Sequence, residues 1–388
     1  MSAGLPRLAV HRIACAVVAA EVKRLRPVDA PLIALQDWPE AMPIGDDGLG
    51  LDSLEQLGAL GALAETFDLD DSALGQVSPD RVGAWIDWIM QSHILGRSRL
   101  TVQTSGSTGT PSVCRHAVAE LIEEAQFLAT QIADQRRVVA LVPAHHLYGI
   151  IWTALLPALV DIPVVVRALG APLELASGDL VVAVPDQWRT LSRLTRAFPD
   201  DVVGISSAGP LDDHVAAALI ESGLKRMFDI YGSSETGGIA MRELPGSAYA
   251  LLPRWQLTPD GDDDWQLTDH DGRHHALPDH VERIGERSLR PTRRRDGAVQ
   301  VGGHNVWPAR VADVLRRIDG VVDAAVRLHF DGRLKAFIVP NSNIDPDELT
   351  VMIERHTADQ LPALERPRHL RFGAALPRNA MGKLEDWS

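Results

Sequence analysis

The sequence predicts a large α/β domain, with a helical region before it and a small α+β domain after it. From Leu100 onward, short apolar runs alternate with helical segments, which is typical of an α/β sheet. Before Leu100 the patterns are helical, and the section after Pro291 contains two strand-like runs and one helix. We therefore divide the chain into residues 1–97, 98–295 and 296–388.

The N-terminal region is predicted to form three helices. Apolar residues recur at helical spacing in Leu8–Leu25, Ser53–Phe67 and Pro79–His93. Between Ala41 and Asp80 there are nine acidic residues and no Lys or Arg, and these charges have to stay solvated. Three leucines of the second helix are expected to face inward: Leu54, Leu57 and Leu60.

The two later sections are read from the same periodicities. Strands of the large sheet are expected at Val138–Val142, Val164–Val166, Leu180–Val184 and Val202–Ile205, with a helix at Val118–Ala133. In the last section we expect paired strands at Val321–Leu328 and Leu334–Pro340 and a helix at Pro346–Gln360.

Charge and cysteine content restrict the partners. The net charge of −14 argues against nucleic acid or an anionic membrane as the main partner. No segment approaches the roughly 20 apolar residues that span a bilayer. Cys15 and Cys114 are the only cysteines, so a disulfide framework or a zinc site is not expected. We expect a cytoplasmic location. A basic run of nine arginines lies between Arg283 and Arg317.

A loop rich in small residues follows the apolar run that begins at Leu100. It comprises Thr104, Ser105, Gly106, Ser107, Thr108 and Gly109. Glycines and hydroxyl residues packed in this way let N–H and O–H groups surround a phosphate without Cβ clashes. The loop lacks the Gly-Lys-Ser/Thr ending of the P-loop nucleotide hydrolases. Taken alone, the string also fits a flexible linker.

Further motifs follow in order, at Pro143–Gly149, Ser207–Leu211, Tyr231–Thr236 and Leu376–Lys383. With the loop, they resemble the adenylate-forming superfamily of acyl-CoA synthetases, peptide-synthetase adenylation domains and luciferases. The resemblance implies that ATP and Mg²⁺ are used to convert a small carboxylic acid into an acyl-AMP, which then passes to a thiol. It also implies that the C-terminal domain is mobile.

The resemblance implies a role for each matching residue. Nucleotide binding falls to the loop Thr104–Gly109 and to Tyr231, Gly232, Ser233, Ser234, Asp279 and Arg294, the last two at the ribose. Glu235 holds Mg²⁺, Lys383 assists adenylation, and Asp296 is the hinge. The acid pocket is formed by His146, Tyr148, Gly209, Gly237 and Gly238, with His146 also counted as catalytic. Asp279 and Arg294 also fit ordinary loop residues.

Departures from the family pattern leave the thiol acceptor open. Ser112, Gln300 and Asn305 replace two lysines and an arginine that are frequent in the family. The shortened chain looks most like the compact ligases of aryl-polyene and xanthomonadin-type pigment biosynthesis. That likeness implies a hydroxybenzoate-like acid and an acyl carrier protein as acceptor. Coenzyme A as acceptor, a medium-chain fatty acid, release of the adenylate itself and a non-catalytic scaffold are the alternatives.

The segment Gly50–Glu55 resembles the attachment motif of acyl carrier proteins. In that motif a serine at the start of a helix carries phosphopantetheine, which makes Ser53 a candidate attachment site and the N-terminal region acyl-carrier-like. The alternative is that Ser53 is only the N-cap of its helix.

Overall fold

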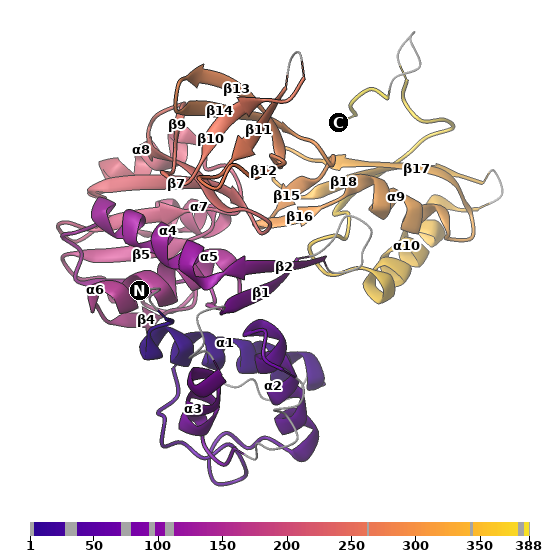
Figure 1. The fold of residues 1–388 in the computed structure, drawn as a ribbon. Helices are drawn as coiled ribbons and strands as arrows, with labels where there is room; N and C mark the ends of the chain where they lie inside the picture. The colour runs from indigo at the N-terminus through magenta and orange to yellow at the C-terminus, as the bar shows by residue number, and fades with distance from the viewer. Residues whose placement is uncertain are drawn as a thin grey trace. The chain divides into compact units, whose positions relative to one another are not determined.

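The computed structural model describes residues 4–27, 37–70, 79–92, 98–104, 112–261, 264–341, 344–378 and 384–387 (Figure 1). These residues form two compact units. The first contains the chain up to Thr104, Ser112–Leu277 and Glu282–Arg290, and the second contains Pro278–Val281 and the chain from Pro291 onward. The limits drawn from the sequence at 97 and 295 stay predictions.

The N-terminal region contains the helices α1 (Arg7–Leu25), α2 (Ser53–Thr66) and α3 (Val82–Ser92). Helix α1 packs against both of the others. The N-cap of α2 is Asp52, whose carboxylate accepts a hydrogen bond from the N–H of Glu55 at 2.8 Å while the Glu55 side chain accepts from the N–H of Asp52. The alternative role of Ser53 as N-cap is therefore wrong, and Ser53 is exposed.

The prediction that Leu54 and Leu57 of α2 face inward is wrong, whereas Leu60 is half-buried. Leu54 and Leu57 are each 67% exposed, whereas Ala59 and Leu63 are fully buried. Residues three apart step back by about 60° around a helix, so a run of them cannot stay on one face. The buried face is instead set by close approach to α1, because a Cβ on Gly58 would lie 2.7 Å from the Leu25 side chain.

The main sheet has nine strands in the order β13-β14-β9-β8-β7-β6-β5-β3-β4, of which the first residues of β13 and the last residues of β14 belong to the second unit. Strands β4, β3, β5, β6 and β7 are parallel, and β7, β8, β9 and β14 are antiparallel. Their bounds are Arg137–Ala140 (β3), Val164–Val166 (β4), Asp179–Ala183 (β5), Val203–Ser206 (β6), Arg226–Ser233 (β7), Gly237–Leu244 (β8), Tyr249–Leu251 (β9), Asp279–Gly285 (β13) and Ser288–Arg294 (β14). The four predicted sheet strands correspond to β3, β4, β5 and β6.

Helices connect the parallel strands. They are α5 (Leu147–Ile150), the π-helix η2 (Ile151–Leu155), α6 (Leu156–Val160), α7 (Pro185–Leu194) and α8 (Asp213–Glu221), whereas α4 (Val118–Gln131) precedes β3, the first of these strands in the chain. Helices α7 and α8 cover the sheet in one apolar core, in which Trp188 and Leu219 pack with Val139 and Val181. Two smaller sheets complete the first unit: β1 (Arg99–Thr104) with β2 (Ser112–Ala117), and β10 (Gln256–Pro259), β11 (Trp265–Thr268) and β12 (His274–His275).

The second unit contains a small α+β arrangement, as the sequence predicts. Strands β17 (Val321–Leu328), β18 (Leu334–Pro340) and β19 (His369–Phe372) form a sheet, with β18 and β19 parallel. Helices α9 (Pro308–Arg316) and α10 (Pro346–Gln360) share its apolar core. Strands β15 (Val299–Val301) and β16 (His304–Val306) form a hairpin.

Among the described residues, none of the helices combines the length and the apolar character needed to span a membrane. Cys15 and Cys114 are buried and unbonded to one another. Neither cysteine supports a disulfide framework, in agreement with the sequence analysis.

Candidate active site

Three of the predicted motifs meet at one edge of the sheet. Strands β3, β6 and β7 run parallel, and each is followed at its carboxyl end by a motif: the segment to Tyr148, the turn at Ser207, and the turn at Glu235. The carboxyl edge of a parallel sheet is the usual place for ligands in α/β folds. The topology therefore brings these sequence-distant motifs to one edge.

A tight turn between β7 and β8 presents Glu235 to solvent. The Ser233 hydroxyl lies 3.0 Å from the Thr236 hydroxyl and accepts from the N–H groups of Glu235 and Thr236 at 3.3 Å. A Cβ on Gly232 would lie only 2.4 Å from the carbonyl oxygen of Gly237, so the two strands require glycine there. Ser233 therefore shapes the turn in this structure.

His116 ties the strand after the phosphate loop to this turn. Its Nε2–H donates to the Ser234 carbonyl oxygen at 2.7 Å, and its ring is buried on β2. Burial lowers the pKa of His116, so the ring is held neutral. His116 was not among the predicted site residues. The alternation of the strand could have indicated it, because Cys114, His116 and Val118 are all buried. A polar residue among buried positions of a strand needs a hydrogen-bond partner.

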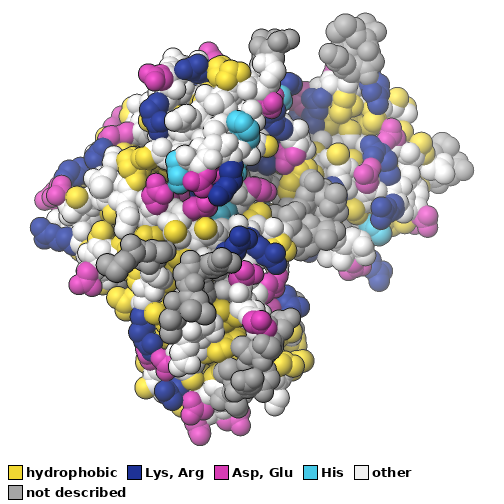
Figure 2. All heavy atoms as spheres, viewed as in Figure 1, with side chains coloured by type: hydrophobic (Ala, Val, Ile, Leu, Met, Phe, Trp, Pro, Cys, Tyr) yellow, Lys and Arg dark blue, Asp and Glu magenta, His cyan; other side chains and the backbone are white. Residues whose placement is uncertain are grey.

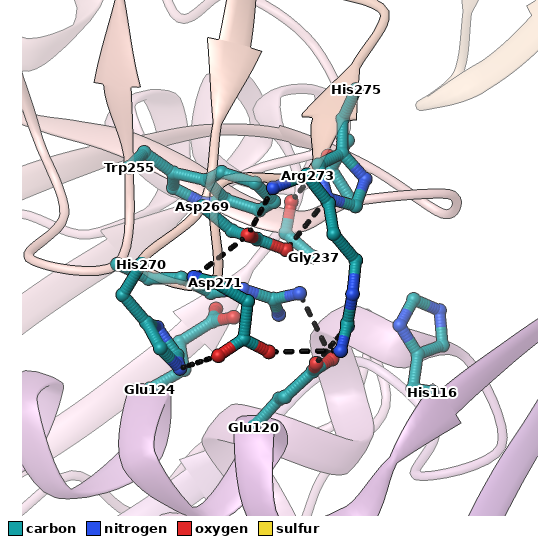
Figure 3. A network of polar contacts seen from close by, with 12 residues as sticks. His116, Glu120, Glu124, Gly237, Trp255, Asp269, His270, Asp271, Arg273 and His275 are labelled. Carbon is teal, nitrogen blue, oxygen red and sulfur yellow. Dashed lines mark hydrogen bonds and ion pairs between the residues drawn. The ribbon is translucent and has the colours of Figure 1, made fainter.

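A buried carboxyl group lies against the two glycines that were assigned to the acid pocket. Glu124, on α4, accepts the Gly238 N–H with both oxygens, at 3.0 and 3.1 Å (Figure 3). Added Cβ atoms would lie 2.8 Å from Glu124 at Gly237 and 2.4 Å at Gly238. Burial raises the pKa of Glu124 to about 7, opposed in part by the Gly238 N–H. Glu124 was not predicted, because no local pattern distinguishes it from the other acidic residues of α4.

Further polar contacts hold α4 to the segment around β11 and β12 (Figure 3). Glu120 on α4 forms an ion pair with Arg254 at 2.9 Å, and the Arg254 guanidinium lies over the Trp255 ring at 4.5 Å. The Trp255 indole N–H donates to the Gly238 carbonyl oxygen at 2.7 Å. Gly238 is therefore held through both its N–H and its carbonyl group.

The outer part of this network combines a buried carboxylate, Asp269, with an exposed ion pair. Asp269 accepts from His275 at 2.9 Å, and Asp271 pairs with Arg273 at 2.9 Å. Histidine, acidic and basic side chains lie side by side on this face of the first unit (Figure 2). The exposed pair of Asp271 and Arg273 contributes little to stability, so the buried contacts of Glu124, Trp255 and Asp269 determine the local structure.

Two adjacent histidines follow β3 and differ in environment. His146 is exposed, whereas His145 is largely buried with its ring centroid 4.2 Å from that of His146. Burial lowers the pKa of His145 to about 3, with further lowering from His146 and Lys23. His145 is therefore neutral at physiological pH. His146, which was predicted to line the acid pocket, is the exposed member of this pair.

The Tyr148 hydroxyl is already engaged by the backbone. It lies 3.1 Å from the Ala183 carbonyl oxygen and 3.0 Å from that of Ile205, and it donates to one at a time. Burial raises the pKa of Tyr148 well above its usual value, and the charge of Asp229 adds to this. In this arrangement Tyr148 offers a ring surface rather than a hydroxyl group.

The turn after β6 is strained at Ala208. This residue has φ +69°, a left-handed conformation that is unusual for alanine, and Gly209 follows it. The Ser207 hydroxyl donates to the Ile230 carbonyl oxygen of β7 at 3.0 Å. Strained backbone held by neighbouring structure is common at ligand sites.

A buried ion pair supports the strand that carries Tyr231. Asp229 on β7 accepts from Arg242 at 2.9 Å and from the Tyr249 hydroxyl at 2.6 Å. The Tyr249 ring lies 5.8 Å from that of Tyr231. Burial raises the pKa of Asp229, and Tyr249 and Arg242 oppose that rise. These contacts hold β7, β8 and β9 together next to Tyr231, which is predicted to bind the nucleotide.

Within the second unit, the predicted ribose and hinge residues lie close together. Asp279 begins β13 and Arg294 ends its neighbour β14, so both lie at one end of the hairpin. Arg294 forms an ion pair with Asp296 at 2.8 Å. Burial alone would raise the pKa of Asp296, but Arg294 and the N–H of Ala298 lower it. The predicted hinge carboxylate is thus ionised and bound to the predicted ribose contact.

Two departures from the family pattern face one another. Gln300 and Asn305 are opposite in the β15–β16 register, and the Gln300 side chain donates to that of Asn305. Gly302 and Gly303 form the turn between them with positive φ. The two substitutions therefore make one neutral cross-strand pair in place of two cations.

Several predicted residues lie outside the described part of the chain. These are Ser105, Gly106, Ser107, Thr108, Gly109 and Lys383. The described neighbours of both segments are paired: Thr104 with Ser112 in β1 and β2, and Arg378 with Leu384 as an isolated bridge.

Comparison with known proteins decides the family. A family model described as "AMP-binding enzyme" matches residues 101–282, and "AMP-binding enzyme C-terminal domain" matches residues 310–383. A protein named 4-coumarate–CoA ligase from Halorhodospira halophila is 38% identical over 376 residues, covering 90% of this chain and 93% of its own. The chain belongs to the AMP-binding enzyme family.

Two further relatives match this chain over nearly its whole length. Proteins with the same name from Cereibacter sphaeroides and Rhodobacter capsulatus are 36% and 37% identical, covering 99% and 97% of this chain and 97% and 100% of their own. The N-terminal region is therefore shared with these relatives. The carrier-like nature expected for it is not shown by these matches.

Solved structures of AMP-binding enzymes share the fold. An o-succinylbenzoate CoA synthetase from Bacillus subtilis has a TM-score of 0.62 at 19% identity, covering 77% of this chain and 73% of its own. A malonyl-CoA ligase has a TM-score of 0.56 at 21% identity, covering 72% and 71%. The large α/β domain with a small C-terminal domain is confirmed. As a member of this family, the chain is an AMP-forming acid–thiol ligase that uses ATP.

Proposed function

We propose that this chain joins a planar aryl acid of the 4-hydroxycinnamate type to coenzyme A through an acyl-AMP. One observation carries the proposal: three relatives, 36–38% identical over 90–99% of this chain, are all named 4-coumarate–CoA ligase. They favour coenzyme A, the alternative in the sequence analysis, over an acyl carrier protein. They also favour a hydroxycinnamate over a hydroxybenzoate, and nothing in them points to pigment biosynthesis.

The basic run offers less attraction for an acidic carrier protein than its sequence suggests. At least four of its nine arginines form ion pairs among the described residues: Arg290 with Glu282, Arg294 with Asp296, Arg310 with Glu365, and Arg316 with Asp313. Each pair cancels a charge that would steer a carrier to this surface. The neutral pair of Gln300 and Asn305 removes two further cations on the acceptor side.

The residues assigned to the acid pocket suit a flat, weakly polar ring. Tyr148 presents its ring because its hydroxyl is bound to carbonyl groups. Gly209 and Gly237 add no side chains, and Glu124 supplies one carboxyl group beside Gly238. A mainly apolar pocket with few polar groups is typical of sites for small aromatic ligands.

The chemistry is a pair of displacements. A carboxylate oxygen of the acid attacks the α-phosphorus of ATP, and the bond to the pyrophosphate oxygen breaks to give acyl-AMP. The thiolate sulfur of coenzyme A then attacks the acyl carbon, and AMP leaves with the electron pair of the broken C–O bond. Both steps depend on the stabilisation of phosphate charge, which we assign to Lys383 and the loop Thr104–Gly109.

The donor set at Glu235 fits Mg²⁺. The Glu235 side chain is exposed in the turn between β7 and β8. Among the described residues, its N–H donates to Ser233, and its carboxylate forms no hydrogen bond or ion pair. Mg²⁺ prefers one or two carboxylates together with phosphate oxygens and water. When bound, the ion supplies charge neutralisation at the phosphates. Glu235 orients it, and Ser233 keeps the turn in shape.

The N-terminal region is proposed to be an integral part of the ligase. Helix α1 packs on η2, and α2 packs on β1. Ser53 remains a candidate attachment site because it is exposed. The test is incubation with coenzyme A and a phosphopantetheinyl transferase, followed by mass spectrometry of the intact protein. A mass increase equal to one phosphopantetheine group, absent in Ser53→Ala, would establish the modification.

Substrate and acceptor are tested in two steps with the full chain. Pyrophosphate exchange is measured with 4-coumarate, 4-hydroxybenzoate and octanoate, and thioester formation is then measured with coenzyme A and with a holo acyl carrier protein. We expect the fastest exchange with 4-coumarate and thioester with coenzyme A. Thioester on the carrier alone would overturn the acceptor, and exchange only with octanoate would overturn the acid. Acyl-AMP release unaffected by either thiol would make the chain an adenylate-only enzyme, and the absence of exchange would indicate a scaffold.

A further inference from the structure

Two histidines and an aspartate, none of them assigned to the reaction, meet on the second unit. They are His329 and Asp331, in the turn between β17 and β18, and His369, the first residue of β19. An imidazole nitrogen of each histidine and a carboxylate oxygen of Asp331 all lie within 4.8 Å of one another. The two imidazole rings are tilted by 33° to one another, with centroids 4.0 Å apart.

The backbone fixes the three residues in place. The turn is closed by the His329 N–H, which donates to the Arg333 carbonyl oxygen at 2.7 Å, and by Gly332, which has φ +79°. Asp331 caps this turn by accepting from the Arg333 N–H at 2.9 Å. His369 is opposite Lys335 in the parallel pairing of β18 and β19. The cluster is therefore set by two strands and a tight turn.

Both carboxylate oxygens of Asp331 face imidazole nitrogens. Nε2 of His369 lies 2.7 Å from one oxygen in a hydrogen bond. Nδ1 of His329 lies 2.9 Å from the other, yet this buried atom is not aligned for a hydrogen bond with any described residue. Two imidazole nitrogens thus converge on one carboxylate, which brings together three ligand atoms of the types that a transition metal binds.

We propose that His329, Asp331 and His369 bind a divalent transition metal such as Zn²⁺ or Ni²⁺. Zinc takes imidazole nitrogen and carboxylate oxygen ligands at about 2.0–2.2 Å, so tetrahedral ligand atoms lie about 3.4 Å apart. The two short contacts of Asp331 have to open by on the order of half an ångström, which side-chain rotation provides. The adjacent cavity of about 420 Å³, lined by both histidines, leaves room for water as a further ligand.

The ligand types of the cluster favour nitrogen-binding metals, although cationic side chains lie nearby. Arg368, Arg371 and Lys335 line the same cavity, and Lys335 is partly neutralised by Asp386 at 2.9 Å. Asp331 is the one carboxylate among the three proposed ligands. Hard cations such as Mg²⁺ depend on several oxygen ligands, whereas imidazole suits Zn²⁺, Ni²⁺ and Cu²⁺. The site is therefore distinct from the Mg²⁺ that accompanies ATP.

The test is titration calorimetry on the full chain, free of nucleotide and of any polyhistidine tag, with Zn²⁺, Ni²⁺ and Mg²⁺ as probes. We expect one Zn²⁺ per chain and no heat from Mg²⁺. Losing one imidazole ligand, in His329→Ala or His369→Ala, should weaken Zn²⁺ binding by at least about tenfold. His356→Ala, a histidine on α10 outside the cluster, should bind as the wild type does.

Asp331→Asn is the second variant, because asparagine still offers an oxygen to the Arg333 N–H and keeps the turn. It should also bind Zn²⁺ at least about tenfold more weakly. The EPR spectrum of bound Cu²⁺ should show coupling to two imidazole nitrogens, reduced to one in His369→Ala. Unchanged Zn²⁺ affinity in His369→Ala and Asp331→Asn, equal binding of Mg²⁺, or no Zn²⁺ binding at all would overturn the proposal.

Discussion

The buried carboxyl group of Glu124 should make the stability of the first unit fall as pH rises. Its pKa is raised from 4.5 to about 7 in the folded chain. Below pH 4.5 the folded and unfolded states both hold the proton. Between 4.5 and 7 the folded state holds more protons than the unfolded state, so stability is lost progressively, and the loss is complete once the pH passes the folded pKa.

The size of the effect follows from the shift. One pKa unit corresponds to about 1.4 kcal/mol, so this shift costs about 3 kcal/mol in total, of which roughly 2 to 3 kcal/mol is lost between pH 5 and pH 8. Glu124→Gln removes the titration and keeps a carbonyl oxygen for the Gly238 N–H. Its amide NH₂ has to turn away from that N–H, which adds a cost that does not depend on pH.

Urea unfolding of the wild type and the variant at pH 5, 6, 7 and 8 measures the effect. Other titrating groups cancel in the difference between the two proteins. The variant should gain roughly 2 to 3 kcal/mol relative to the wild type from pH 5 to pH 8. Glu123→Gln, at the exposed neighbouring position on α4, should show no such trend. A difference between Glu124→Gln and wild type that stays constant with pH would refute the reasoning.

Three further predictions concern the reaction and its scaffold. Lys383→Ala should lower pyrophosphate exchange by roughly a hundredfold or more while ATP still binds, because one positioned charge is lost; exchange at the wild-type rate would contradict its role. Glu235→Gln should lower exchange by a similar factor and raise the Mg²⁺ concentration needed for half-maximal rate, and an unchanged Mg²⁺ requirement would remove Glu235 from the metal site. Gly232→Ala should cost about 1–3 kcal/mol of unfolding free energy, since its Cβ would meet the Gly237 backbone at 2.4 Å. Gly285→Ala, whose Cβ would have only ordinary contacts at 3.8 Å, is the matched control, and equal stability of the two variants would count against the clash.

Most secondary structure could be predicted from the sequence, because it depends on local periodicity. The strands at Val164–Val166, Val321–Leu328 and Leu334–Pro340 and the helix at Pro346–Gln360 have the predicted limits. The leucine stripe of α2 was predicted wrongly because the buried face of a helix depends on its neighbours. Here the close approach of α1 at Gly58 decides it.

The sequence by itself determined the family and the order of the site motifs. Glycines, hydroxyl residues and the Tyr231–Thr236 motif are short-range signals, since each is needed where a backbone approaches a phosphate or makes a tight turn. Tertiary structure alone decided which charged and polar groups lose water. Glu124 is one of several acidic residues on α4, and only its burial against Gly238 raises its pKa. His329 and His369 are forty residues apart, and only the parallel pairing of β18 with β19 brings their nitrogens to one carboxylate. Desolvation and distance depend on packing, which no local pattern encodes.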